Sequence, residues 1–241
     1  MNKINNSSYA VKELTVTDVV KQAGGLDFIS NVGSHSGNKY FINAETTIKE
    51  QLDWAHYLNL NNAASLDILD IGTGAGFFPF ICRAYGHNVE SCDELYKLYW
   101  DEGYEVLNLT PKNYLVEKNK SIGNIFGKKF DVIVSFRSFL GTTKYWIPQN
   151  EVDIWGIDEW KFFFKDCSKH LLKSDDSYIF FQCNPGSQLL PYVNMNPNDI
   201  SDWGPKELGD FFLQFQKDQN GNRVLFGTKF CITKRQIDNE C

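Results

Sequence analysis

The sequence predicts an α/β fold: a doubly wound, mostly parallel seven-stranded sheet with helices on both faces. Short apolar segments rich in β-branched residues alternate with amphipathic segments of helical period, which is typical of such sheets. A glycine-rich turn joins the first of these strands to the helix that follows it. The last two apolar segments have no helix between them, so we expect a C-terminal antiparallel hairpin. The N-terminal segment is expected to form a helical cap.

Length, charge and cysteine use limit the class of protein. The 241 residues are 42% hydrophobic and 15% aromatic, a globular composition that is long enough for one substantial domain. The net charge of −6 is opposite in sign to that of general nucleic-acid binders. No apolar run reaches the roughly 20 residues of a bilayer span, and we find no secretory signal. The 6 cysteines and 4 histidines are scattered. We expect a cytoplasmic protein with no metal, nucleic-acid or membrane partner.

The N-terminal segment carries two predicted helices and a loop. Hydroxyl residues before an apolar run and two glycines after it predict a short helix over residues 15–25. Glycine and serine predict a loop at 33–38. Thr47 and Glu50 have the spacing of a capping box, and the apolar residues that follow predict an amphipathic helix over 47–60. The chain is accordingly divided into a cap or lid (1–45), a main domain (46–235) and a frayed acidic tail (236–241).

The middle of the chain carries the first three strand candidates. Residues 66–71 are a short apolar run that enters the glycine turn, and 88–92 form the second candidate. Between them, residues 78–85 have one apolar face and end at a glycine, which predicts a helix. Residues 105–109 are a weak third strand candidate.

The second half carries four more strand candidates and one long helix. Residues 130–136 are rich in β-branched side chains, and 178–183 form an apolar run closed by Asn-Pro-Gly. Apolar residues at helical spacing predict a helix over 156–172 between these two strands. Residues 211–215 and 224–233 are the two strands of the expected hairpin.

The most informative segment is the turn Asp70-Ile71-Gly72-Thr73-Gly74-Ala75-Gly76. Its glycines let a ligand approach the backbone, and free N–H groups face the ligand at the start of the next helix. A dinucleotide fingerprint would need a glycine where Phe77 stands, and no P-loop lysine follows. Asp93 ends the second strand candidate, where its two oxygens can accept hydrogen bonds from both ribose hydroxyls. The alternative is a turn that only packs the helix on the strand.

These residues resemble the class I, Rossmann-like methyltransferases that use S-adenosylmethionine (SAM). The resemblance covers about residues 45–235, and the segment 155–163 is similar to a little-characterised bacterial subgroup. It implies SAM as the cofactor and S-adenosylhomocysteine as the product. It also implies a set of residues around the cofactor: Asp70, Gly72, Thr73, Gly74, Gly76, Phe77, Asp93, Glu94, Asn108, Ser135 and Phe136.

The resemblance also implies a part of the cofactor for each residue. Asp70 and the glycine backbone would surround the methionine moiety, Asp93 the ribose, and Glu94 would lie beside the adenosine. Ser135 and Phe136 would line the sulfonium and the substrate entrance. The family often has an aspartate after the third strand that reaches the adenine amino group, and here the nearest equivalent is Asn108, whose amide oxygen can accept the same hydrogen bond.

Substrate-binding and catalytic candidates come from the residues around this core. Arg137 can clamp a carboxylate or phosphate, or it is a surface arginine in a salt bridge. Trp146 and Trp155 are candidates for an aromatic wall around the substrate or the sulfonium. His35 and His56 are weak candidates for a general base, with a structural or exposed histidine as the alternative.

The expected activity is transfer of the SAM methyl group to a small polar or anionic metabolite, for instance a sugar derivative. The alternative is a non-catalytic SAM-binding protein that acts as a partner domain. An NAD-dependent oxidoreductase is disfavoured by the glycine spacing. The segment Ser135-Phe136-Arg137-Ser138 stands where methyltransferases of adenine or glutamine amides would carry an Asn-Pro-Pro-Tyr motif, which argues against those acceptors.

Overall fold

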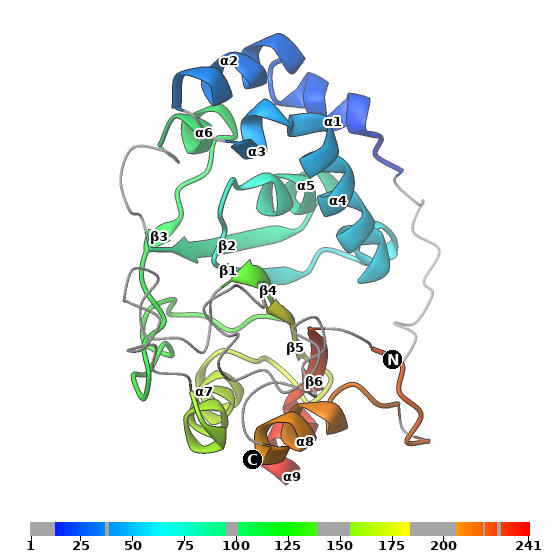
Figure 1. The fold of residues 1–241 in the computed structure, drawn as a ribbon, viewed down its shortest axis with the longest axis vertical. Coiled ribbons are helices and arrows are strands. Elements are labelled where there is room, and N and C mark those ends of the chain that lie inside the picture. Colours follow the sequence, from blue (N-terminus) through cyan, green and yellow to red (C-terminus); the bar gives the residue numbers. More distant parts are fainter. Residues whose placement is uncertain are drawn as a thin grey trace. The chain divides into compact units, whose positions relative to one another are not determined.

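The computed structural model describes residues 13–36, 39–94, 101–138, 155–183, 206–218, 220–225 and 228–241. The chain folds into two compact units, Met1–Leu115 and Val116–Cys241 (Figure 1). The N-terminal helices belong to the first unit, where they pack on the helices that follow them in the chain. The expected division into a cap and a main domain near residue 45 stays a prediction. Within the described ranges, no helix combines the length and apolar character needed to cross a bilayer.

The first unit contains a parallel sheet of three strands in the order β3-β2-β1. In the register of β1 and β2, Asp67 lies opposite Asn88 and Ile71 opposite Cys92. Ile68 and Leu69 of β1 are fully buried. The elements are α1 (Val16–Gln22), α2 (Leu26–Ser36), α3 (Lys39–Ile42), α4 (Ala44–Tyr57), η1 (Leu60–Asn62), β1 (Asp67–Ile71), α5 (Phe77–Tyr85), β2 (Asn88–Asp93), α6 (Asp101–Val106) and β3 (Lys112–Asn113).

The N-terminal helices follow their predicted apolar spacing but not their predicted ends. Ile48 and Ala55 are fully buried on α4, which packs against α5. The expected capping box at Thr47 is wrong: the helix begins at Ala44, and the Thr47 hydroxyl donates to the Asn43 carbonyl oxygen (3.2 Å). The expected loop at 33–38 is also wrong up to Ser36, because α2 continues through it. Packing of the buried Ile29 side chain of α2 outweighs the weak helix propensity of glycine and serine.

The second unit contains three strands, of which β4 and β5 are parallel and β5 and β6 antiparallel. The expectation of mostly parallel strands with antiparallel pairing at the C-terminal end is therefore confirmed. The expected hairpin is wrong, because the helix Lys206–Gln214 lies between β5 and β6 in the chain. The elements are β4 (Val132–Ser138), α7 (Ile157–His170), β5 (Tyr178–Cys183), α8 (Lys206–Gln214), β6 (Lys229–Thr233) and α9 (Lys234–Glu240).

The described residues form six strands, not the expected seven. The segment 211–215, predicted as a strand of the hairpin, belongs to α8 and the turn that follows it. Leu208, Phe211, Phe212 and Phe215 share one helical stripe and are all buried. The segment 105–109 is the end of α6 and a turn, and the third strand follows it at β3. Short apolar runs fit a strand and a buried helix equally well, and here packing decided for the helix.

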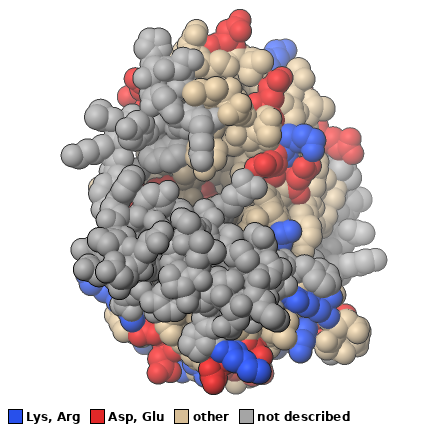
Figure 2. All heavy atoms as spheres, in the orientation of Figure 1, with Lys and Arg blue, Asp and Glu red and all other residues tan. Residues whose placement is uncertain are grey.

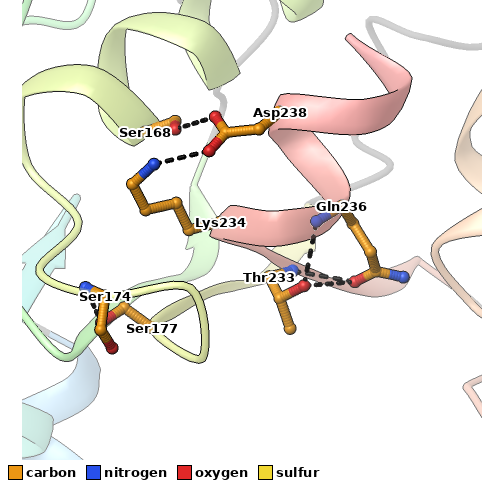
Figure 3. A network of polar contacts seen from close by, with 7 residues as sticks. All are labelled: Ser168, Ser174, Ser177, Thr233, Lys234, Gln236 and Asp238. Carbon is orange, nitrogen blue, oxygen red and sulfur yellow. Dashed lines mark hydrogen bonds and ion pairs between the residues drawn. The ribbon is translucent and has the colours of Figure 1, made fainter.

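The C-terminal segment is a well-anchored helix, α9, and the prediction of a frayed tail at 236–241 is wrong. Thr233 and Gln236 form a capping box: the Thr233 hydroxyl accepts from the Gln236 N–H (3.2 Å) and the Gln236 side-chain oxygen accepts from the Thr233 N–H (2.9 Å) (Figure 3). Asp238 accepts hydrogen bonds from Ser168 of α7 and from Lys234. Ile237 is fully buried. These contacts join α9 to α7.

Charged side chains are mixed over the described surface. Figure 2 shows acidic and basic side chains interspersed on one face, with no extended patch of either sign among the coloured atoms. Several pairs sit one helical turn apart, such as Lys49 and Asp53 (3.2 Å), in the arrangement that weakly stabilises exposed helices.

The capping box of α9 leads to a stability prediction. Thr233→Ala removes the acceptor of the Gln236 N–H and should lower the free energy of unfolding by about 1 kcal/mol. Thr46→Ala, on the exposed side of α4, serves as the control and should change stability little. Urea unfolding measures both variants, and equal stabilities would show that the cap does not hold α9.

Candidate functional site

The candidate site lies in the first unit, where β1 and β2 end. Gly72, Gly74 and Gly76 form the turn from β1 to α5 and all adopt left-handed backbone angles, with φ of +76°, +55° and +82°. The N–H groups of Gly72 and Thr73 both donate to the carbonyl oxygen of Cys92 on β2, at 2.8 and 3.3 Å. The turn, called the glycine loop below, is thereby tied to the end of the neighbouring strand.

The second and third glycines serve different purposes. A Cβ on Gly76 would lie 2.5 Å from Leu109 Cδ1, so this glycine allows close packing of the loop on the turn after α6. A Cβ on Gly74 would meet only the Gly72 carbonyl oxygen, at 4.0 Å. The space beside Gly74 is therefore open among the described residues, as the approach of a ligand to the backbone requires.

Asp93, the last residue of β2, holds the middle of the glycine loop. Its Oδ2 accepts a hydrogen bond from the Gly74 N–H at 2.6 Å. Burial raises the pKa of Asp93 to about 6, while hydrogen bonds from the backbone N–H groups of Gly74 and Glu94 oppose this shift. The carboxylate keeps further lone pairs for donors from a ligand.

Asp70 is a buried acid at the end of β1 with one unsatisfied oxygen. It is 2% exposed, and its Oδ2 has no hydrogen-bond partner among the described residues. Burial raises the pKa of Asp70 to about 7; a hydrogen bond from the Thr73 side chain opposes the shift, and the nearby charge of Asp93 adds to it. A buried carboxylate oxygen without a hydrogen-bond donor costs free energy.

Tyr104, on α6, contacts the glycine loop and was missed by sequence analysis. Its hydroxyl donates to the Gly74 carbonyl oxygen at 2.8 Å, and its side chain is 5% exposed. No local motif marks it, because the contact joins residues 30 positions apart.

The structure brings together most of the predicted cofactor residues. Asp70, the glycine loop with Thr73, and Asp93 with Glu94 all lie where β1 and β2 end. Phe77 follows the loop but is 2% exposed and packs on Phe41, with ring centroids 5.0 Å apart. Its side chain thus belongs to the core.

Asn108 does not stand where the resemblance required. It precedes β3 instead of following the third strand, and it sits in a left-handed turn with φ of +50°. Its carbonyl oxygen accepts a hydrogen bond from Arg83 (2.7 Å). The displacement arises because residues 105–109 form the end of a helix and a turn. The expected strand at 105–109 is therefore wrong, and the assignment of Asn108 to adenine stays a prediction.

The candidates in the second unit are in part outside the described residues. Ser135 is fully buried in β4, and Phe136 packs near Phe180 with centroids 6.0 Å apart. The side chain of Arg137 and the whole of Trp146 lie outside the described residues. Trp155 is 1% exposed and packs against Trp160 at 5.2 Å, which places it in the aromatic core and is at odds with an exposed substrate wall.

Of the two histidine candidates, His56 alone has a described side chain. His56 is exposed on α4, and its Nε2 forms a hydrogen bond with the Tyr85 hydroxyl at 2.9 Å. His35 falls in α2, with a side chain outside the described residues. In the part of the chain that the structure describes, no three His, Cys, Asp or Glu residues are grouped to hold a metal ion.

No family model and no curated protein matches the sequence. Among solved structures, TehB from Haemophilus influenzae has 15% identity over 77% of this chain and 61% of its own, with a TM-score of 0.43. PH0226 from Pyrococcus horikoshii OT3 has 15% identity over 78% and 91%, with a TM-score of 0.46. An S-adenosylmethionine-dependent methyltransferase from Clostridium acetobutylicum ATCC 824 has 20% identity over 59% and 52%, with a TM-score of 0.37.

This chain thus spans less than two thirds of the length of TehB and of the Clostridium acetobutylicum protein. These similarities are too low to assign the chain to a family.

The raised pKa of Asp70 leads to a pH prediction. An unfolded aspartate has a pKa of about 3.9, so between about pH 4 and pH 7 the folded state holds a proton that the unfolded state has lost. The contribution of Asp70 to stability is therefore full below about pH 4 and is lost as the pH rises through about 7.

Asp70→Asn keeps the shape and removes this titration. At about pH 8 it should raise the free energy of unfolding of the ligand-free protein by up to about 4 kcal/mol, and at about pH 4 by little. Urea unfolding across this range is the measurement, with the exposed Asp27→Asn as the control. In the Asp70→Asn variant, the raised pKa of Asp93 should still make stability fall as the pH rises, but less steeply. A variant less stable than the parent at about pH 8 would contradict the assignment of a strained, buried charge.

Proposed function

We propose that the chain binds SAM at the glycine loop and transfers its methyl group to a small polar or anionic metabolite. The observation that carries the proposal is the buried Asp70 Oδ2. None of the described residues donates a hydrogen bond to it, and it lies beside a loop whose central glycine is open to a ligand. Such an oxygen fits a cationic donor, and the methionine end of SAM carries an ammonium group.

The two carboxylates favour SAM over a dinucleotide. Asp70 lies near the end of β1, opposite Ser91 of β2, and Asp93 ends β2 two residues after Ser91. Both can carry negative charge at neutral pH, since their pKa values are about 7 and about 6. SAM brings an ammonium and a sulfonium to this site, whereas the pyrophosphate of NAD would bring two further negative charges.

Asp93 is suited to hold the ribose. Its bond to the Gly74 N–H fixes the orientation of the carboxylate, and its remaining lone pairs can accept hydrogen bonds from the two ribose hydroxyls. Asp70 and Asp93 would thus bind the two ends of one ligand across the glycine loop.

The chemistry itself is supplied by SAM, whose sulfonium carries an activated methyl group. The residues of this chain have to hold the cofactor, orient the acceptor in line with the methyl group and exclude water. For the acceptor we propose a metabolite with an anionic or polar group, on the strength of Arg137 in β4 and of the aromatic residue Trp146 that follows in the sequence. Trp155 is left out of this set because it is buried.

A non-catalytic SAM-binding protein is the second candidate function. It is favoured by one observation: the only histidine candidate with a described side chain, His56, is bonded to Tyr85 and lies on the exposed side of α4. Both candidate functions require the same cofactor site.

The cofactor is tested by calorimetry with SAM, S-adenosylhomocysteine and NADH. SAM should bind more tightly than NADH, and Asp93→Ala should weaken SAM binding by about 10- to 100-fold, as expected for loss of a charged acceptor. Asp27→Ala, an exposed residue of α2, should bind SAM like the parent protein. Tighter binding of NADH than of SAM would refute the proposal.

Methyl transfer is tested with methyl-labelled SAM and a low-molecular-mass metabolite extract. The parent protein should transfer label to a small molecule. Arg137→Ala should abolish transfer while SAM affinity stays within a few-fold, because the partner of this side chain is the acceptor. SAM binding without any transfer by the parent protein would favour the non-catalytic alternative, and loss of SAM binding in the variant would place Arg137 in the cofactor site.

A further inference from the structure

We propose that Tyr104 is a positioning residue for the glycine loop and that Phe41 of the N-terminal segment keeps it in place. The inference rests on the proposed function, since it takes the glycine loop as the cofactor site. It assigns the N-terminal helices a role in cofactor binding, carried by contacts inside the first unit.

Gly74 is attached to the rest of the first unit by hydrogen bonds at both of its peptide groups. Its N–H donates to Asp93 Oδ2 (2.6 Å), and its carbonyl oxygen accepts from the Tyr104 hydroxyl (2.8 Å). The two bonds hold opposite ends of one residue whose φ is +55° and whose side-chain position is open. A glycine in open space has several accessible conformations, and these two bonds restrict Gly74 to fewer of them.

The helix α6 packs directly on the glycine loop. A Cβ on Gly76 would lie 3.4 Å from Tyr104 Cδ1 as well as 2.5 Å from Leu109 Cδ1, so α6 and the turn after it lie directly against the last glycine. The backbone of this turn is closed by a bond from the Leu109 N–H to the Tyr104 carbonyl oxygen (2.8 Å). Tyr104 is thereby held at both its backbone and its hydroxyl.

The N-terminal segment packs against α6 through Phe41. Phe41 of α3 is fully buried, and a Cβ on Gly103 would lie 2.3 Å from its Cζ, so ring and helix backbone are in tight contact. The same ring packs on Phe77, the first residue of α5, at 5.0 Å. Phe41 therefore contacts both the helix that carries Tyr104 and the helix that begins where the glycine loop ends. Figure 1 shows α2, α3 and α6 together in the first unit, and α2 packs on both of the others.

The position of Gly74 affects how readily the Asp93 carboxyl group ionises. The Gly74 N–H is one of the two backbone donors that oppose the raised pKa of Asp93. The acids near Asp93 are Glu94, next in the chain, and Asp70 on β1; the base on the neighbouring strand is Lys112, opposite Cys92. If Tyr104 releases Gly74, this donor is less well aimed and the carboxylate of Asp93 becomes harder to ionise.

Tyr104→Phe removes the hydroxyl alone and keeps the ring packed. In the ligand-free protein, amide hydrogen exchange at Gly74 should become about tenfold faster. SAM affinity measured by calorimetry should fall about three- to tenfold, as expected for one hydrogen bond. The pH at which SAM binding is half-lost should move upward, a change that a merely structural role would not produce. Tyr57→Phe, an exposed tyrosine of α4, is the matched control and should leave all three unchanged.

Each outcome separates this inference from the proposed function. If the parent protein binds SAM and Tyr104→Phe matches it in affinity, the positioning role is refuted and the proposed function stands. If the parent protein binds no SAM, the proposed function fails, and exchange at Gly74 alone decides whether Tyr104 fixes the loop. Phe41→Leu, which loosens the contact with Gly103, should shift exchange and affinity in the same direction as Tyr104→Phe, and no change in either would refute the part assigned to Phe41.

Discussion

The attachment of the glycine loop to the end of β2 is the interaction on which the rest of the site depends. The Cys92 carbonyl oxygen accepts two loop N–H groups and the Asp93 carboxylate accepts a third. Because Cys92 lies opposite Ile71 in the register of the two strands, the sheet itself sets where the loop stands. Left-handed glycine conformations then let the chain turn sharply into α5 without covering its own backbone.

The same arrangement makes the site less stable than a wholly apolar one would be. Asp70 is buried with an oxygen that no described group satisfies, next to a second acid whose charge raises its pKa further. Such a group costs stability in the ligand-free protein, and proteins tolerate this cost chiefly where a ligand supplies the missing donor. Stability and cofactor binding are therefore coupled through one side chain.

The aromatic residues serve the core more than the site. The ring centroid of Trp160 lies 5.0 Å from that of Phe212 and 5.5 Å from that of Phe164, and Trp155 packs in the same cluster. An aromatic-rich sequence invites assignment of tryptophans to a ligand wall, yet a large ring fills a core as readily as it lines a pocket. Trp155 comes just before α7 and packs against that helix, where burying its large apolar ring stabilises the fold.

Local hydrophobic period and glycine spacing were enough to predict the course of the chain from β1 through the glycine loop to Asp93. They also predicted α7, β4 and β5. The sequence also indicated the acids of the site, Asp70 and Asp93, by their place after apolar runs. The other elements and contacts depend on packing between segments that are distant in the sequence. The run at 211–215 became helical because Phe211 and Phe215 pack on Phe164, and the bond from Tyr104 to Gly74 joins residues 30 positions apart. Neither contact leaves a trace in local spacing, since its energy exists only once distant segments of the chain meet.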